Sequence, residues 1–343
     1  MRTDALTVGL PVHNAMPFLP ETIASLLNQD HRDFRILIID DGSTDGSPGY
    51  LETVKDSRVR LLRQENHGLA YTLNRMLREA DTPWLLRHDA DDIAYPNKVG
   101  AVIGHIRRFP SAGMFYSLAD YYQDGRSFGS FRTTIAPPSV LANLTRAGYL
   151  LAICHPAAAL NIEKTLALGG YRFDLHIEDI DLWWRMALLH DMVLIPEVTV
   201  GVRHNLSSVC GGNLETNALN TLYVQYQLIS YLWGLSPLPY EEATKKLGGL
   251  MDKRQLEFRW HIRKASAHVG RRQYVRAMGH AARSFLTAPG YFLKRVAYEL
   301  GRGEIAVNGL EPKVFASMSE ALWRTDQALF RGIKGERTYP DGR

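Results

Sequence analysis

The chain has 343 residues, of which 45% are hydrophobic and 22% are charged. These values are typical of a soluble globular protein and exclude an intrinsically disordered or fibrous chain. The length suggests about two domains. Residues 1–243 carry 20 basic and 27 acidic side chains, whereas residues 244–343 carry 20 and 9. We therefore expect two parts that face different partners, unless the basic helices merely expose solvated faces.

The sequence indicates a protein of the cytoplasm. Its apolar runs are shorter than the roughly 20 residues that a membrane-spanning helix needs. Residues 1–4 lead directly into a strand pattern and lack the apolar segment of a signal peptide. The two cysteines, Cys154 and Cys210, have no metal-ligand spacing, which is typical of a reduced compartment.

The first 110 residues alternate between strand and helix patterns. Strands are predicted at 6–12, 35–39, 59–62 and 84–86, and helices from Pro20 and over 49–55 and 70–80. This alternation predicts right-handed βαβ units, and hence an α/β fold with a mostly parallel sheet flanked by helices. The less regular stretch that follows contains strand patterns at 114–118 and 192–195 and helical patterns at 140–146 and 179–189.

The chain changes character beyond residue 204. A polar stretch over 205–213 leads into mainly helical sequence, so we place a domain boundary near residue 210. Two helical patterns, 255–269 and 273–287, resemble one helix-turn-helix unit of the tetratricopeptide kind, too little for a repeat array. Residues 290–300 form a basic amphipathic segment that could either lie on an anionic membrane or pack on the first domain.

Three acidic clusters stand out: two follow strands, where an open parallel sheet binds its ligands, and the third lies at a probable helix start. They are Asp40-Asp41, Asp89-Ala90-Asp91-Asp92 and Glu178-Asp179-Ile180-Asp181. The crowded carboxylates of the second cluster predict a Mg²⁺ or Mn²⁺ site, with helix capping as the alternative. For the other two clusters, capping and ligand binding remain equally open. An ionised Asp at the start of a helix could serve as a general base.

Several other chemistries find no support in the sequence. There is no glycine-rich phosphate loop, no Ser-His-Asp arrangement, no paired Cys/His zinc pattern and no nucleic-acid-binding motif. The residues alone therefore allow a metal-dependent transfer reaction on an α/β sheet and no more.

The ordered set of motifs resembles the family 2 glycosyltransferases, which are inverting, nucleotide-sugar-dependent enzymes with a GT-A fold. The resemblance rests on Leu10–Asn14, Ser25–Gln29, Ile39–Asp45, Asn66–Leu69, Asp89–Asp92, His155-Pro156, Leu168–Tyr171 and Glu178–Trp183. His13 replaces the usual Tyr, and Arg203 and His204 are adjacent where the family has one residue between them. The resemblance covers about residues 1–205 and implies a GT-A catalytic domain over 1–210, followed by a basic helical region over 211–343.

The resemblance also implies a role for each site residue. The nucleotide sugar would be held by Pro11, His13, Asn14, Asp41, Asn66, Gly68 and Asp89. Asp91, Asp92 and His204 would bind the divalent cation, Mn²⁺ or Mg²⁺, which would act as a Lewis acid on the departing diphosphate. Asp179 would be the general base, and Gly170, Tyr171, Glu178 and Asp181 would contact the donor or acceptor sugar. Residues 207–213 would close over the bound donor.

The implied function is transfer of a sugar from a nucleoside-diphosphate sugar, preferably UDP-linked, to a saccharide or lipid-linked acceptor. Such a step belongs to polysaccharide or glycolipid synthesis for a bacterial cell envelope, at the inner face of the membrane. One alternative is a non-catalytic nucleotide-sugar-binding homologue that acts as a scaffold. The joint presence of Asp41, Asp89, Asp91 and Asp179 argues against it. A nucleotidyltransferase would need a glycine-rich basic loop that Leu10–Asn14 does not supply. No nucleic-acid partner is expected.

Overall fold

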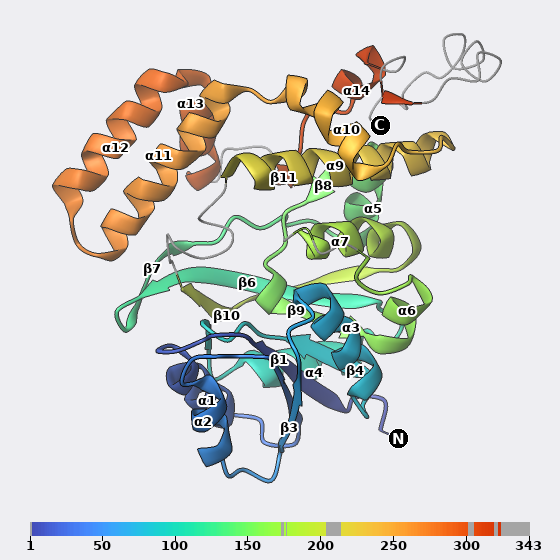
Figure 1. Ribbon diagram of the computed structural model, residues 1–343, viewed down its shortest axis with the longest axis vertical. Coiled ribbons are helices and arrows are strands. Elements are labelled where there is room, and N and C mark those ends of the chain that lie inside the picture. Colours follow the sequence, from blue (N-terminus) through green and yellow to red (C-terminus); the bar gives the residue numbers. More distant parts are fainter. Residues whose placement is uncertain are drawn as a thin grey trace.

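The computed structural model describes residues 2–172, 175, 177–203, 214–300, 305–318 and 322–323. Within these ranges the central sheet has nine strands, in the order β3-β2-β1-β4-β9-β6-β10-β5, with β7 paired to β6 (Figure 1). The strands are β1 (Leu6–Val12), β2 (Arg35–Asp41), β3 (Val59–Gln64), β4 (Trp84–Arg87), β5 (Ile93–Ala94), β6 (Met114–Gln123), β7 (Arg126–Ser130), β9 (Ala158–Asn161) and β10 (Met192–Arg203). A second sheet pairs β8 (Leu150–Leu151) with β11 (Val307–Asn308).

The strand directions confirm the expected α/β class. Strands β1 to β4 run parallel to one another, and β6 runs parallel to β10. Three strands that the sequence did not predict, β5, β7 and β9, run antiparallel to their neighbours. The large sheet is therefore mixed, with its parallel half at the N-terminal end of the chain.

Helices cover both faces of the sheet and form the C-terminal part. They are α1 (Leu19–Leu27), α2 (Ser47–Thr53), α3 (Leu69–Glu79), α4 (Lys98–Arg108), α5 (Pro138–Arg146), α6 (Ile162–Ala167), α7 (Glu178–Leu189), α9 (Leu214–Trp233), α10 (Tyr240–Leu247), α11 (Lys253–Gly270), α12 (Tyr274–Thr287), α13 (Pro289–Glu299) and α14 (Lys313–Ser317). Short 3₁₀ turns occur at His155–Ala157 and Gly248–Leu250.

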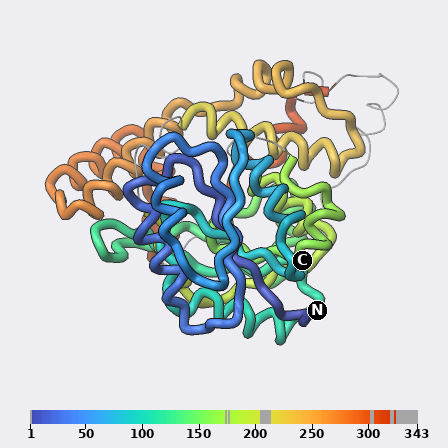
Figure 2. The backbone as a smooth tube through the Cα atoms, turned by 60° about the horizontal axis from the view of Figure 1, so that its bottom comes forward, coloured from blue at the N-terminus to red at the C-terminus, as the bar shows by residue number. Residues whose placement is uncertain are grey.

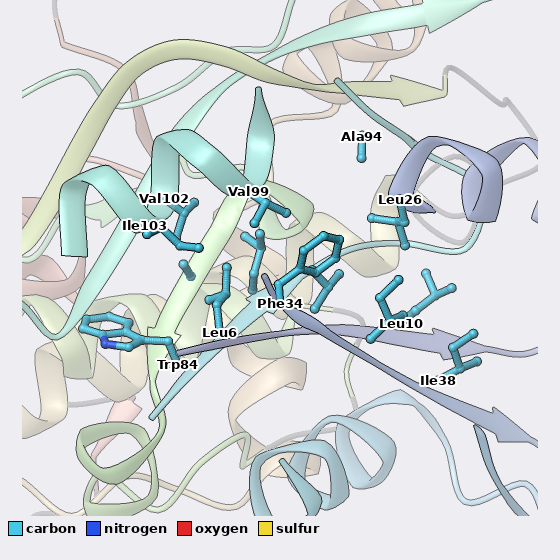
Figure 3. Close-up of a cluster of buried hydrophobic side chains, with 14 of the residues drawn as sticks. Leu6, Leu10, Leu26, Phe34, Ile38, Trp84, Ala94, Val99, Val102 and Ile103 are labelled. Carbon is cyan, nitrogen blue, oxygen red and sulfur yellow. The ribbon is translucent and has the colours of Figure 1, made fainter. Parts of the chain in front are cut away.

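The hydrophobic core lies in two layers, one on each face of the sheet. Every residue of β1 is buried, which explains why its sequence is continuously apolar rather than alternating. On one face, strand residues such as Leu10 and Ile38 pack with Leu26 of α1 and Val99 of α4 (Figure 3). On the other face, side chains of α3 and α7 complete a second cluster that includes Trp183. The two layers hold the carboxyl ends of β1, β2 and β4 in fixed positions.

The helical C-terminal part is attached to the sheet domain through α9. Val224 and Leu228 of α9 are fully buried against Trp184 of α7. The predicted helices at 255–269 and 273–287 correspond to α11 and α12, which form a hairpin that projects from one side of the molecule in both views (Figures 1 and 2). The boundary predicted near residue 210 falls outside the described residues and stays a prediction. No described helix combines the length and apolar character needed to span a membrane.

Candidate active site

The first acidic cluster lies at the carboxyl end of β2, where Asp41 is buried. Its Oδ1 accepts hydrogen bonds from Nε2 of Gln64 at 2.6 Å and from the backbone N–H of His67 at 2.9 Å. Its Oδ2 accepts one from the N–H of Gly68 at 3.0 Å. Asp41 therefore holds the loop that leads into α3. A carboxylate oxygen can accept two hydrogen bonds, so Oδ2 keeps one lone pair for a ligand.

The loop after β1 is tied to the same place by His13 and Asn14. Nδ1 of His13 lies 2.8 Å from the carbonyl oxygen of Asp41, so Nδ1 donates and Nε2 is the accepting nitrogen. Nε2 lies 3.1 Å from the amide nitrogen of Asn14 and 3.3 Å from that of Asn66. Oδ1 of Asn14 accepts from the N–H of Thr44 at 2.7 Å. These contacts bring together six residues expected at the nucleotide sugar, namely Pro11, His13, Asn14, Asp41, Asn66 and Gly68.

The second acidic cluster follows β4. Asp89 forms an ion pair with Arg87, which is buried. Within the described ranges, the carboxylate of Asp91 has no ion pair and accepts no hydrogen bond from another residue. Burial and the nearby charge of Asp89 raise the pKa of Asp91 to about 6. Burial, followed by the charges of Asp91 and Asp89, also raises the pKa of Asp92.

The loop that holds this cluster is braced from the end of β10. The backbone N–H of Arg203 donates to Oδ1 of Asp92 at 2.8 Å, and its side-chain Nε donates to the carbonyl of Asp91 at 2.7 Å. Its guanidinium also forms an ion pair with Glu21 at 2.6 Å. The side chain of Arg203 therefore supports the acidic loop instead of extending toward a diphosphate. His204 and residues 207–213 lie outside the described residues.

The acidic loop has the chemistry of a divalent-cation site that the ligand completes. The described residues contain no group of three His, Cys, Asp or Glu side chains placed to hold a metal. Mg²⁺ is, however, usually held by one or two carboxylates, together with substrate phosphates and water. The carboxylate of Asp91 meets that requirement, and Asp89 and Asp92 each keep one further oxygen, because Arg87 and Arg203 occupy only the other one. The residues present therefore fit a hard cation shared with a diphosphate.

The third acidic cluster begins α7, where two adjacent carboxyl groups have different environments. Glu178 is buried, and one of its oxygens lies 3.6 Å from Nδ1 of His155. Asp179 is half-buried, and its Oδ1 accepts from the N–H of Ile180 at 2.8 Å. Burial raises the pKa of Asp179 to about 6, and burial together with the charge of Asp179 raises that of Glu178 to about 8. Both carboxyl groups thus hold a proton more firmly than usual, and of the pair the more deeply buried Glu178 is favoured to keep a proton while Asp179 is favoured to ionise.

The ends of β4 and α7 form a single electrostatic site. Beyond burial, the negative charge of Asp89 raises the pKa of both Glu178 and Asp179, and the positive charge of Arg87 lowers both. The structure thus brings the carboxylate of the second acidic cluster into the field of the third.

Gly170 and Tyr171 hold the segment before α7 in place. The side-chain amide of Asn74 pairs with the backbone of Tyr171 in both directions, at 2.7 and 2.9 Å. The hydroxyl of Tyr171 lies 2.9 Å from Nε2 of His155. Gly170 has φ +63°, and a Cβ there would lie 2.3 Å from Oδ1 of Asn74. Both residues are buried, so they connect α3 to α7 beneath the site.

Asp181 does not match the sugar contact expected from the sequence. It is fully buried, and it accepts hydrogen bonds from Arg172 at 2.6 Å, Trp184 at 3.1 Å and Arg185 at 2.6 Å. These donors occupy both carboxylate oxygens, so Asp181 anchors α7 and has no oxygen left for a sugar hydroxyl.

Two buried basic side chains of the site, Arg87 and Lys98, were not predicted from the sequence. Besides Arg87, Lys98 at the start of α4 is fully buried, and its Nζ donates to the carbonyls of Arg87 at 3.0 Å and Pro156 at 2.7 Å. Burial lowers the pKa of Lys98 to about 7. Arg87 is the last residue of the apolar strand β4, and this position is the one sequence signal that could have indicated a buried basic side chain here. Lys98 gives no such signal, because a lysine on a helix is normally solvated.

Comparisons with known proteins agree with this geometry. Residues 7–166 match the family model described as glycosyl transferase family 2. The putative glycosyltransferase EpsE of Bacillus subtilis is 26% identical over 191 residues, which cover 52% of this chain and 66% of EpsE. The glycosyltransferase GlyG of Streptococcus pneumoniae is 28% identical over 132 residues, which cover 38% of this chain and 43% of GlyG. The chain thus spans just under two thirds of EpsE and less than half of GlyG.

Solved structures share the fold over most of the chain. The crystal structure of S. aureus TarS 1–349 in complex with UDP-GlcNAc has a TM-score of 0.53 at 13% identity, and the match covers 87% of this chain and 92% of that one. The complex of the same protein with UDP gives 0.51 at 12% identity, covering 82% and 91%. At these identities the likeness shows the fold alone. The family match over 7–166 includes the acidic clusters at the ends of β2 and β4. Residues 7–166, just under half of the chain, therefore match the family 2 glycosyltransferases, and the fold is of the GT-A kind.

Proposed function

We propose that this chain transfers a sugar from a nucleoside-diphosphate sugar to an acceptor hydroxyl, with inversion at the anomeric carbon. One observation carries the proposal: Asp179 lies in the first turn of α7 next to the acidic loop, because Lys98 joins the carbonyls of Arg87 and Pro156, and His155 lies 3.6 Å from Glu178. A donor held by that loop and an acceptor activated by Asp179 would therefore meet.

The donor nucleotide in this proposal is uridine diphosphate. The base would lie at the edge formed by Pro11, His13 and Asn14, where the free lone pair on Oδ2 of Asp41 can accept from an imino N–H. Asn66 and Gly68 shape the wall of this edge. The similarity of the fold to TarS, whose structure was solved with UDP-GlcNAc, supports a UDP-linked donor.

A divalent cation, Mn²⁺ or Mg²⁺, would be held by Asp91 and Asp89, with Asp92 and His204 as further candidates. When bound, it would neutralise charge on the departing diphosphate. Arg87 holds Asp89 in position, and Arg203 fixes the backbone of the acidic loop. These contacts keep the carboxylates oriented toward the donor before it binds.

The chain's own residues supply the proton transfer. Asp179 accepts the proton of the acceptor hydroxyl while the hydroxyl oxygen forms a bond to the anomeric carbon. The bond from that carbon to the diphosphate oxygen breaks with its electron pair, so a single displacement inverts the configuration. Glu178, which is favoured to keep its proton, can donate a hydrogen bond that orients the acceptor. Gly170 and Tyr171 position α7 and both carboxyl groups.

The acceptor in this proposal is a saccharide or a lipid-linked saccharide used in polysaccharide or glycolipid synthesis, at the inner face of a bacterial membrane. The bacterial glycosyltransferases among the relatives support this setting. Since the chain covers only part of those relatives, their own activities are not carried over.

Replacement of the proposed base tests the function. The protein is incubated with a panel of UDP-, dTDP- and GDP-sugars and Mn²⁺, and released nucleoside diphosphate and thermal stabilisation are both measured. Asp179→Asn should lower turnover by about 10²- to 10⁴-fold and leave donor-induced stabilisation intact. The matched control is Asp191→Asn, because Asp191 is an exposed carboxylate just beyond the other end of α7.

The results separate the proposal from its alternative. Donor binding without turnover by the unmodified protein, over the whole panel and with acceptor mixtures, would identify a non-catalytic binding homologue. Turnover that is unchanged in Asp179→Asn would remove Asp179 from the proposed role.

A further inference from the structure

Among the described residues, exposed apolar side chains are concentrated on α12 and α13. Nine of the 18 exposed large hydrophobic side chains in the described ranges lie between residues 274 and 300. We define the outer apolar surface by six of them: Val275, Met278, Leu286, Leu293, Val296 and Leu300. A concentration of this kind on a soluble protein marks a contact site, because isolated exposed hydrophobic residues are normally scattered.

On α12 the apolar side chains form one stripe that faces away from the protein. The helix packs on α11 through Ala277 and Ser284, which are buried. With about 100° of rotation per residue, Val275, Met278 and Leu286 fall within an arc of about 80° outside that packed side. Val275 is 80% exposed and Leu286 is 76% exposed. Nothing in the described part of the chain covers this stripe.

The stripe continues onto α13, which has no buried residue. Leu293, Val296 and Leu300 follow the i, i+3, i+7 spacing of one helix face. The rings of Phe285 on α12 and Phe292 on α13 pack edge to face at 5.5 Å, which joins the two helices. The sequence left open whether residues 290–300 pack on the first domain: Tyr298 does contact Thr133 and Arg132 there, whereas Leu293 and Leu300 stay 60% and 65% exposed.

The same helices are strongly basic. Residues 271–300 carry six basic side chains and one acidic side chain, Glu299. Arg276 and Arg283 fall on the exposed side of α12 next to the apolar stripe, so basic and apolar strips run side by side along the helix. Figure 1 shows α12 on the outer edge of the molecule, beyond α11 and away from the sheet.

We propose that the outer apolar surface docks on an anionic lipid membrane. Amphipathic helices with apolar and basic strips insert the apolar side chains at the level of the headgroups, while Lys and Arg attract anionic lipids. A second copy of this chain is a poorer occupant, because a symmetric contact would place two basic surfaces against each other. The proposal concerns attachment alone and is independent of the transferase activity.

Sedimentation with vesicles tests the docking. The full chain, without donor, is mixed with vesicles of phosphatidylcholine alone or with 30% phosphatidylglycerol, at low and high salt, and the pelleted fraction is measured. We expect pelleting with the anionic vesicles at low salt and at least a tenfold weaker affinity for the neutral ones. The variant Val275→Ser/Leu286→Ser should weaken binding to anionic vesicles at least tenfold, and Arg276→Glu/Arg283→Glu should do the same at low salt.

The matched control is Leu189→Ser, since Leu189 at the end of α7 is 63% exposed but lies outside the surface. It should bind vesicles like the unmodified protein. Thermal unfolding of every variant checks that it is folded, and a variant that unfolds early is replaced by Met278→Ser/Leu293→Ser. Failure to pellet with anionic vesicles at low salt would overturn the proposal. So would a concentration-dependent dimer, seen by light scattering, that the same substitutions abolish while vesicle binding stays unchanged.

Discussion

Two neighbouring residues at the start of α7 carry carboxyl groups with separate protonation states. Glu178 is buried beside a neutral histidine, because burial lowers the pKa of His155, whereas the half-buried Asp179 accepts a backbone hydrogen bond that favours its ionised form. Because the two side chains start from different positions on the first turn, Glu178 favours the protonated form and Asp179 the ionised form. The pair offers one proton acceptor and one hydrogen-bond donor to an incoming hydroxyl.

The raised pKa of Asp179 predicts how activity depends on pH. Only the ionised carboxylate can accept a proton, so kcat/KM should fall about tenfold per unit below a pH of about 6, and it should decline again above about 8, where Glu178 loses the proton that it donates. Asp91 also has a pKa near 6, but a bound cation favours its ionised form, so the profile is measured at saturating Mn²⁺. The residual activity of Asp179→Asn should lack this acidic limb. An unmodified protein whose kcat/KM stays flat from pH 5 to 7 would contradict the assignment.

At the scale of single elements, the connection between α3 and α7 depends on one glycine. Gly169 and Gly170 both have positive φ, at +86° and +63°, but only at Gly170 would a Cβ meet another side chain, that of Asn74. Asn74 in turn holds the backbone of Tyr171 on the path into α7. The two adjacent glycines therefore separate the effect of backbone strain from that of a steric clash.

We expect Gly170→Ala to destabilise the protein more than Gly169→Ala. Both should lose about 1–2 kcal/mol from the left-handed backbone, and Gly170→Ala about 1–3 kcal/mol more from displacement of the Asn74 side chain. Urea denaturation measures both free energies of unfolding. In an Asn74→Ala background, where the clashing side chain is gone, Gly170→Ala should lower the free energy of unfolding only as much as Gly169→Ala does. The loss caused by Gly169→Ala should be the same with and without Asn74→Ala. If both glycine variants lose the same unfolding free energy, the Asn74 side chain can move aside without destabilising the protein, and the prediction is wrong.

The sequence predicted most clearly the strands that are buried on both faces, because such strands appear in the sequence as continuous apolar runs. Strands β1 and β2 are apolar throughout because both of their faces are covered. Strand β9 was missed because Ala158–Asn161 is short and contains two alanines, and β7 because Arg126–Ser130 is largely polar and exposed. The predicted strand at 192–195 stops at Pro196, whereas β10 continues through an irregularity to Arg203.

The site residues also divide into those that a local sequence pattern indicates and those that depend on tertiary packing. Asp41 and Asp91 could be found because they lie at or just beyond the carboxyl ends of strands, and Asp179 because it lies in the first turn of a helix. Asp181 was grouped with Asp179, yet two residues along a helix correspond to a rotation of about 200°, so it faces the opposite side and lies among arginines. The burial of Arg87 and Lys98 depends on tertiary packing, which no local pattern records.

At the scale of the whole molecule, the helical part divides into two roles. Helix α9 lies against the sheet domain, where Gln225 donates to the carbonyl of Gly148 at 3.0 Å and β11 pairs with β8. The hairpin of α11 and α12 projects from the molecule, and α12 and α13 carry the outer apolar surface. The charge split in the sequence follows this arrangement. The three carboxylate clusters lie in the acidic part, and the basic side chains of residues 271–300 lie on the projecting helices.

This arrangement predicts that the sheet domain and α9 unfold together. Leu228 is fully buried between α9 and Trp184 of α7, so Leu228→Ala should lower the free energy of unfolding by about 2–4 kcal/mol. The loss should appear in the same transition that tryptophan fluorescence and circular dichroism report, since a cavity at the contact weakens both parts at once. Leu293→Ala on the exposed stripe is the control and should change the unfolding free energy by less than about 0.5 kcal/mol. Two separate transitions, of which Leu228→Ala shifts only one, would instead place an independent folding boundary between α7 and α9, close to the residue 210 that the sequence suggests.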